Sequence, residues 1–454
     1  MTQPAQPPSA VCAADLARTE AIVHDASILD GDPADHSEKS ADTWIAVSGE
    51  TVIARGRGHG WKDLAASASV EVIDGAGGYL APAFVDIHCH GAGGASAEDG
   101  RAGLDTILAV HRRHGTRALA LSYVSDTIDG LCRSLTAGAE LVRDRSEVIG
   151  LHAEGPFLAP DFKGAHAAGV LTAPTPEAVE AILAAADGTL AQITIAAELP
   201  GALDAIARLT SAGVRVALGH TAADYDQAAA AFDAGASILT HAFNAMPGIH
   251  HRAPGPILAA REAEHVTVEL INDGVHVVAP AARMLRELVP GRIALITDAM
   301  AATGMSDGDY MLGSLPVRVE DSVARLVTAD GSVGAIAGST LTMGEAVRRA
   351  VTEVGMSPSE AVQAAGLVPL RALGLTAGQA AGPTDGPAGR SGNGPAGRPG
   401  DGSAGRPGDG SAGRPGDGPA PGNDGSAALL APGMPADLLL LDRDMSIRRT
   451  WYSH

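Results

Sequence analysis

The residues of this chain best suited to chemistry are histidines and carboxylates, each placed where an apolar run of strand length ends. Such side chains can bind a divalent metal ion or move a proton. They are His88 with His90, Glu154, His220, His241 and Asp298. Because the carboxyl ends of parallel strands meet at one face of a (β/α)8 barrel, we expect these side chains to form one metal-dependent hydrolytic site.

The spacing of His88 and His90 is the most informative of these features. On an extended strand, residues two apart point to the same side, so both imidazoles can reach one ion. Cys89 then faces the opposite wall, where we interpret it as a small buried apolar residue. A single His or Asp at a strand end is more often a core or capping group than a ligand, so the prediction depends on the whole set.

Eight apolar runs predict the frame that positions these residues. The runs are apolar almost throughout and alternate with Ala-rich helical stretches, which indicates a parallel sheet covered on both faces. They are 83–87, 116–123, 148–151, 190–197, 214–219, 236–240, 266–271 and 292–297. We therefore predict an α/β fold, a TIM-like (β/α)8 barrel over residues 80–375.

Two segments outside the barrel are predicted to be halves of one small β-domain. Residues 1–79 and 427–454 carry short strand-like pieces that could not bury a core alone, so we expect them to pair in a β-sandwich. Residues 305–338 predict a hairpin-rich excursion after the eighth strand, which we expect to cover the active site.

Residues 376–426 differ in kind from the rest of the chain. They contain four consecutive eight-residue units, rich in Gly and Pro, from Ala388 to Pro419. With almost nothing apolar to bury and no glycine at every third position, the segment is predicted to be a disordered insertion rather than collagen. Loop-closure entropy grows slowly with length, so it costs little stability, and we interpret it as a neutral repeat expansion.

Composition favours a soluble enzyme of the cytoplasm. The chain has 454 residues and 45% apolar content, enough for a large core with an added small domain. Cys12, Cys89 and Cys132 are too few, and odd in number, for a disulfide framework, which indicates a reducing compartment. The N-terminus has no leader pattern and no apolar run is long enough to span a bilayer, so we expect no membrane partner.

The net charge of −21 argues against nucleic acid as a partner, since phosphate backbones require a basic surface. A small phosphorylated ligand needs only a few local cations and is compatible with this charge. Candidate cations lie in two stretches near the proposed site, at Lys163, His166, His250, His251 and Arg252.

Several motifs, in order along the chain, closely resemble those of the N-acetylglucosamine-6-phosphate deacetylases of the amidohydrolase superfamily. They are PAFVDIHCHG (82–91), HAEGPFL (152–158), KGAH (163–166), LGHT (218–221), THAFNAMPGIHHRAPG (240–255), NDGVH (272–276), ITDAM (296–300) and AGSTLTM (337–343). The resemblance covers roughly 45–375 and resumes at 435–442. The chain departs from the family pattern at two positions, where Ala83 replaces the usual glycine and Ala197 replaces the usual proline. Neither position has a direct chemical role.

The resemblance implies a ligand set and a catalytic group. Glu154, His220 and His241 match the metal ligands, and one carboxylate with two neutral imidazoles suits a borderline divalent cation. The HxH pair implies a second ion, so we expect one or two per subunit, zinc foremost, with iron, manganese or cobalt as alternatives. Asp298 matches the acid/base that takes a proton from the attacking water and returns it to the sugar amine.

Substrate contacts are also implied by the resemblance. The matching positions are Ala165, His166, Asn244, Ala245, His251, Arg252, Asp273, His276, Ile336, Ala337 and Gly338. Among them, Arg252 suits bidentate pairing with the phosphate. Family members are commonly homodimers in which the arm that carries this arginine completes the neighbour's pocket, so we expect a homodimer.

The expected activity is hydrolysis of N-acetylglucosamine 6-phosphate to glucosamine 6-phosphate and acetate. Three alternatives remain open. The substrate can be the 4-epimer, N-acetylgalactosamine 6-phosphate, because discrimination at one hydroxyl depends on pocket geometry. Hydrolysis of a cyclic amide is disfavoured. Related enzymes that hydrolyse cyclic amides ordinarily use a carboxylated lysine as the ligand that bridges their two ions, whereas this chain has Glu154 in that role. A barrel without catalysis should lack a ligand or the aspartate, and none is missing.

Overall fold

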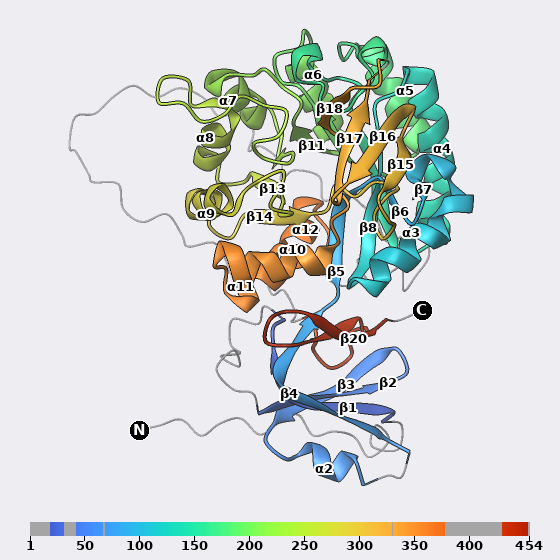
Figure 1. Ribbon diagram of the computed structural model, residues 1–454, viewed down its shortest axis with the longest axis vertical. Coiled ribbons are helices and arrows are strands. Elements are labelled where there is room, and N and C mark those ends of the chain that lie inside the picture. Colours follow the sequence, from blue (N-terminus) through green and yellow to red (C-terminus); the bar gives the residue numbers. More distant parts are fainter. Residues whose placement is uncertain (1–18, 31–41, 67–68, 329, 377–428, 453–454) are drawn as a thin grey trace, which may run out of the picture.

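The computed structural model describes residues 19–30, 42–66, 69–328, 330–376 and 429–452. Its central sheet has eight parallel strands, each hydrogen-bonded to the next in chain order (Figure 1). The strands are β5 Phe84–Cys89, β8 Thr116–Tyr123, β9 Val148–Glu154, β10 Leu190–Ile195, β11 Arg215–Leu218, β12 Ile238–Leu239, β13 Thr267–Ile271 and β14 Ile293–Ile296. All eight apolar runs are thus confirmed as strands of one sheet.

Backbone hydrogen bonds between the first and last strand ends bring the sheet round into a barrel. The amide of Asp298 donates to the carbonyl of His88 at 2.9 Å, and the amide of His90 donates to the carbonyl of Ala299 at 2.8 Å. A parallel bridge between Cys89 and Ala299 continues the ladder. The predicted TIM-like barrel is confirmed.

Helices between and after the strands cover the outside of the barrel (Figure 1). In α3, Leu104, Ile107 and Leu108 are buried while Asp105 and Thr106 are exposed, the spacing of an amphipathic helix. The helices are α3 Arg101–Arg113, α4 Ile128–Asp144, α5 Pro176–Ala186, α6 Ala202–Ser211, α7 Tyr225–Asp233, α8 Gly255–Glu262, α9 Ala279–Leu288, α10 Met343–Arg349, α11 Pro358–Ala364 and α12 Leu367–Ala372. This layer buries the outer face of the strands.

Strands from both ends of the described chain form a separate six-stranded sheet (Figure 1). Its order is β20-β19-β4-β1-β2-β3, and β1 and β4 are the parallel pair. Where a sandwich was expected, the described strands form one mixed sheet with a cluster of buried side chains on each face. The strands are β1 Ala21–Ile28, β2 Thr43–Ser48, β3 Thr51–Arg57, β4 Glu71–Pro82, β19 Leu438–Leu441 and β20 Ile447–Trp451.

A four-stranded antiparallel sheet follows the eighth barrel strand, as the hairpin-rich stretch predicted. Leu312 and Val317 of this sheet pack with Ala165 and Met300 of the barrel loops. The sheet therefore lies against the loops at the carboxyl ends of the barrel strands. Its strands are β15 Gly308–Leu312, β16 Leu315–Glu320, β17 Val323–Val327 and β18 Val333–Ile336.

Shorter elements complete the described structure. They are α2 Trp61–Leu64, β6 Gly91–Ala92, β7 Ala95–Ser96, the 3-10 helices η2 Ala97–Asp99, η3 Pro160–Phe162 and η4 Ala168–Val170, and the π-helix η5 Ala350–Val354. Within the described ranges, no helix has the length and apolar character needed to cross a bilayer. The predicted disordered insertion, 376–426, lies outside the described residues except for Thr376 and stays a prediction.

The ion pair between Arg117 and Asp437 joins the barrel to the β-domain. Arg117 lies on β8, Asp437 directly precedes β19, and their side chains are only 8% and 11% exposed. Because removing one partner leaves a buried charge uncompensated, Asp437→Ala should lower the free energy of unfolding by about 3–5 kcal/mol. The control is Glu71→Gln, whose exposed pair with Arg449 should matter little. Denaturant unfolding measures both variants, and equal losses would contradict the expectation.

Candidate metal centre and active site

Backbone geometry at the strand ends holds the predicted site residues at the mouth of the barrel. Glu154 is the last residue of β9. His220, His241 and Asp298 come just after β11, β12 and β14, and their φ angles are positive, at 48°, 27° and 50°. This left-handed conformation is uncommon for residues other than glycine and is concentrated where function constrains the chain. The chain thus turns sharply at each of these three positions.

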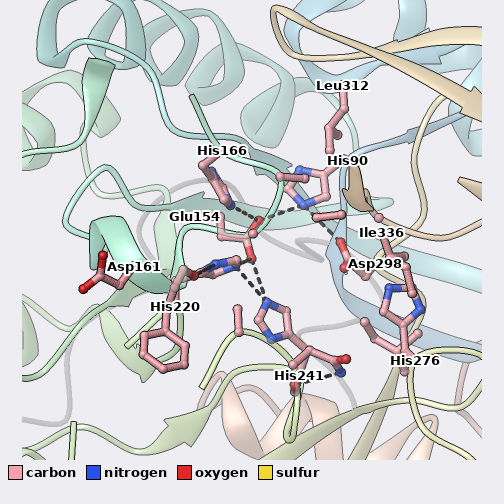
Figure 2. Close-up of a pocket in the computed structure, with 18 residues that line it drawn as sticks. His90, Glu154, Asp161, His166, His220, His241, His276, Asp298, Leu312 and Ile336 are labelled. Carbon is pink, nitrogen blue, oxygen red and sulfur yellow. Dashed lines mark hydrogen bonds and ion pairs between the residues drawn. The ribbon is translucent and has the colours of Figure 1, made fainter. Parts of the chain in front are cut away.

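The carboxylate of Glu154 is the centre of the group (Figure 2). Its Oε1 lies 3.1 Å from Nε2 of His220 and 3.1 Å from Nε2 of His241. Its Oε2 lies 3.2 Å from Nε2 of His90, which is 3.3 Å from Oδ1 of Asp298. All five residues are buried. The structure therefore brings together the predicted ligands and the predicted acid/base, from five different strand ends.

In two of these imidazoles, a backbone carbonyl beside Nδ1 shows which ring nitrogen carries a proton. Nδ1 of His220 and Nδ1 of His90 each lie 3.0 Å from a backbone carbonyl oxygen. Carbonyl oxygens only accept, so both Nδ1 atoms carry a proton and, in the neutral ring, Nε2 presents a lone pair. Nδ1 of His88 lies 3.2 Å from the carboxylate oxygen Oε2 of Glu269.

The Nε2 atoms of the four imidazoles lie close to one another and to the carboxylates. Nε2 of His88 lies 3.2 Å from Nε2 of His90, and Nε2 of His220 lies 3.1 Å from Nε2 of His241. Such approaches are repulsive unless positive charge lies between them. Nitrogen and carboxylate ligands are those that a borderline divalent cation prefers. The residues present fit one ion among Glu154, His220 and His241, whose facing atoms lie 3.1 Å apart, and a second beside Glu154 and the pair of His88 and His90.

The charges of the described side chains favour the same conclusion. Burial disfavours a charged imidazole, but the carboxylates of Glu154 and Asp298 outweigh it at two rings. They hold the pKa of His88 well above its ordinary value and raise the pKa of His90 to about 9. The pocket therefore attracts positive charge, and a metal ion bound there takes the place of those protons.

His166 presents a donor rather than a lone pair. Its Nδ1 accepts a hydrogen bond from the backbone amide of Ser125 at 3.2 Å, so the proton of the neutral ring is on Nε2. Burial lowers the pKa of His166 to about 4, which keeps the ring neutral. Its Nε2 is 3.4 Å from Oε2 of Glu154. This ring suits a hydrogen bond to a substrate oxygen, the contact predicted for it.

A cavity of about 330 Å³ opens beside these residues, within the range of small-molecule sites. The predicted substrate residues that line it are Ala165, His166, Asn244, Ala245, His276, Ile336 and Gly338. Lining residues missed by the sequence analysis are Asp161, Phe162, Gly164, Ile271, Leu312 and Ala335. Phe162, Gly164 and Ala335 are each next to a predicted residue in the chain. Leu312 comes from the hairpin sheet, and its only sequence signal is an apolar side chain in a segment expected to cover the site.

Four predicted substrate residues do not line this cavity. His251 and Arg252 are exposed on the turn between β12 and α8, where Nη1 of Arg252 is 2.6 Å from Nε2 of His251. Asp273 lies 2.6 Å from Nδ1 of His276 and orients that ring. Ala337 is fully buried between two lining residues. Within a single chain, the phosphate-binding candidate is therefore not part of the cavity wall.

A buried carboxylate beneath the centre, Glu269, was not predicted. It lies on β13 and accepts hydrogen bonds from Nε2 of Gln192 at 2.8 Å and from the amide of His241 at 3.3 Å. The sequence did hold a sign of this residue, since Glu269 is a charged residue inside the apolar run 266–271. A carboxylate buried on such a strand is tolerated only where it has hydrogen-bond partners.

Comparison with known proteins places this geometry in a family. The model of the amidohydrolase family matches residues 79–381. A relative from Escherichia coli O157:H7, named N-acetylgalactosamine-6-phosphate deacetylase, is 37% identical over 302 residues, which are 65% of this chain and 78% of the relative. Another from Vibrio furnissii, named N-acetylglucosamine-6-phosphate deacetylase, is 34% identical over 301 residues, or 65% and 73% of the two chains.

Solved structures extend the similarity to nearly the whole fold. A mutant N-acetyl-D-glucosamine-6-phosphate deacetylase from Mycobacterium smegmatis, in complex with N-acetyl-D-glucosamine-6-phosphate, matches with a TM-score of 0.75. It is 34% identical, and the match covers 95% of this chain and 97% of that one. The chain belongs to the amidohydrolase family, among its N-acetylglucosamine-6-phosphate deacetylases.

Proposed function

We propose that the protein hydrolyses the acetamide of N-acetyl-D-glucosamine 6-phosphate, giving D-glucosamine 6-phosphate and acetate in amino-sugar catabolism and recycling. The observation that carries the proposal is the convergence of imidazole Nε2 atoms on two carboxylates, Glu154 and Asp298, beside a small-molecule cavity. The similar structure with this phosphosugar bound supports the choice of substrate.

In this proposal Glu154, His220 and His241 would hold one divalent ion, and His88 and His90, beside the same carboxylate, would hold a second. A bound divalent ion lowers the pKa of water and polarises a carbonyl. Zinc is the ion we propose, because imidazole and carboxylate are ligands it readily takes, although iron, manganese and cobalt accept the same set.

Asp298 carries the proton in the proposed reaction. It lines the cavity, with Oδ1 3.3 Å from Nε2 of His90. Burial raises the pKa of Asp298, but the imidazoles of His88 and His90 outweigh burial and lower it below the ordinary value, so the carboxylate is ready to accept. It takes a proton from the water that attacks the acetyl carbonyl and returns it to the departing amine. Nε2–H of His166 binds a sugar oxygen.

Arg252 binds the phosphate in this proposal, presented by the neighbouring subunit of a homodimer. Arg252 is exposed on a turn and does not line the cavity of its own chain. This position supports the proposal that the turn extends away from its own barrel toward the neighbouring subunit. Large apolar side chains are exposed on the same turn and on the segment that follows β13, and they favour association. They are Ile249, Val275, Val278 and Met284.

A second candidate substrate is the 4-epimer, N-acetylgalactosamine 6-phosphate. The relative that is 37% identical is named for that sugar, which is the observation in its favour. Acetate release from both epimers, measured side by side, distinguishes the two. The few and odd-numbered cysteines support a cytoplasmic location for either activity.

Asp298→Asn should keep the fold and the bound ion but reduce kcat by at least about a hundredfold, because an amide cannot carry the proton from water to amine. Acetate release and metal content of the purified variant are the measurements. Asp233→Asn, the same change at an exposed position on α7, is the control and should leave kcat unchanged. Turnover within a few-fold of wild type in Asp298→Asn would contradict the assigned role.

Arg252→Ala should raise KM for the phosphosugar about tenfold to a hundredfold, the loss of a charged bidentate contact of about 1.5–3 kcal/mol. Activity on unphosphorylated N-acetylglucosamine, poor from the start, should barely change. Arg261→Ala removes another exposed arginine, on α8, and serves as the control. Equal losses on both sugars would show that Arg252 supports the fold, and an active monomer at nanomolar concentration would rule out the shared pocket.

Removal of the ion by a chelator should abolish turnover, and added Zn²⁺ should restore it, because the proposed reaction needs activated water. Circular dichroism should change little, since the strands and the covering helices pack against each other through apolar side chains. The measurement is acetate release before chelation, after it and after Zn²⁺ is returned. Undiminished turnover in a preparation with no detectable metal would overturn the metal-dependent mechanism.

A further inference from the structure

Glu269 is a buried carboxylate that the proposed reaction does not use directly. It lies on β13 with no exposed surface, inside the barrel and beneath the metal centre. A carboxylate in such a place persists only where donors surround it. Its position on an otherwise apolar strand therefore calls for a role that an apolar side chain could not fill.

Three groups contact the two oxygens of Glu269. Oε1 accepts from Nε2 of Gln192 at 2.8 Å. Oε2 accepts from the backbone amide of His241 at 3.3 Å and lies 3.2 Å from Nδ1 of His88. Two of the three groups are donors, and a proton on Nδ1 of His88 makes the third contact a hydrogen bond to the same acceptor.

The opposite nitrogen of His88 faces two further carboxylates. Its Nε2 lies 3.5 Å from Oε1 of Glu154 and 3.6 Å from Oδ1 of Asp298. Either oxygen would accept a proton carried on Nε2. A neutral His88 ring is therefore offered an acceptor on both sides, and the stronger partner decides which nitrogen is protonated.

We propose that Glu269 is the positioning residue of His88. By accepting the hydrogen of Nδ1, it keeps the proton off Nε2, so that the Nε2 lone pair stays available as a metal ligand. The ring is also held in one orientation. This inference depends on the second ion of the proposed function, and it adds the side chain that makes His88 able to bind that ion.

Gln192 makes a sharp test possible. Its Oε1 is buried and has no hydrogen-bond partner among the described residues, so this oxygen can accept a new hydrogen bond if the amide turns over. In Glu269→Gln, a turned Gln192 can accept from the new amide nitrogen, while the new amide oxygen still accepts from His88. Glu269→Leu removes the acceptor altogether. The first variant is therefore the conservative rescue of the second.

The experiment titrates Zn²⁺ into full-length wild type, Glu269→Leu and Glu269→Gln, with a competing chelator and elemental analysis to count ions. We expect two ions in the wild type. In Glu269→Leu the second ion should bind about 10–100-fold more weakly while the first is unchanged, the usual effect of removing a partner of a ligating histidine. Glu269→Gln should bind the second ion more tightly than Glu269→Leu. A merely structural role would weaken both ions together.

The outcomes separate the two claims. Two ions of unchanged affinity in Glu269→Leu would overturn the positioning role alone, whereas a single ion in the wild type would overturn the second site and the positioning role with it. In a His88→Asn background, Glu269→Leu should have no further effect on ion binding. If Glu269→Leu does not fold, Glu269→Met replaces it, because this flexible apolar side chain is close to glutamate in length and lacks the carboxylate.

Discussion

The hydrogen bond from the amide of Asp298 to the carbonyl of His88, at 2.9 Å, is the contact on which the site depends. It closes the barrel, so the end of the last strand lies beside the end of the first. In an open sheet of the same strand order, Asp298 and the pair of His88 and His90 would lie at opposite edges. Closure alone brings the proton carrier and the imidazoles to one wall.

The barrel interior below the metal centre is polar, unlike the packed apolar layers usual in this fold. His152 lies between two hydroxyls, with Nδ1 2.9 Å from Oγ of Ser122 and Nε2 2.9 Å from Oγ1 of Thr194. Burial lowers the pKa of His152 well below its ordinary value, so the ring is neutral and both hydroxyls can be satisfied. With Glu269 and Gln192, this layer gives the imidazoles above it fixed neighbours.

The gathering of the site residues could be predicted from the sequence, but their orientation could not. Each ligand directly follows an apolar run, and parallel strands of a barrel must end at one face, so Glu154 and His220 had to meet. The proton position on each ring depends on contacts such as the one between His88 and Glu269, which join residues that no local pattern relates.

The limits of the fold prediction have the same cause. The strands of the small β-domain were identified, but whether they form one sheet or two is decided by pairing between distant segments, which short runs do not encode. Leu312 reaches the cavity because of the register of a hairpin, and Arg252 lies outside it because of a turn. The local sequence was therefore enough to predict that these elements exist, but their positions in the fold depend on tertiary contacts.

The pairing of β19 with β4 sets an order of events during translation. Leu439 pairs with Ala81, and the entire barrel lies between them in the chain. The first strands leave the ribosome early, yet one edge of β4 has no partner until β19 has been made. An unpaired edge invites pairing with other chains, so the nascent protein carries this hazard throughout synthesis of the barrel. The β-domain contains the first described strand of the chain and is nonetheless the last part to be completed.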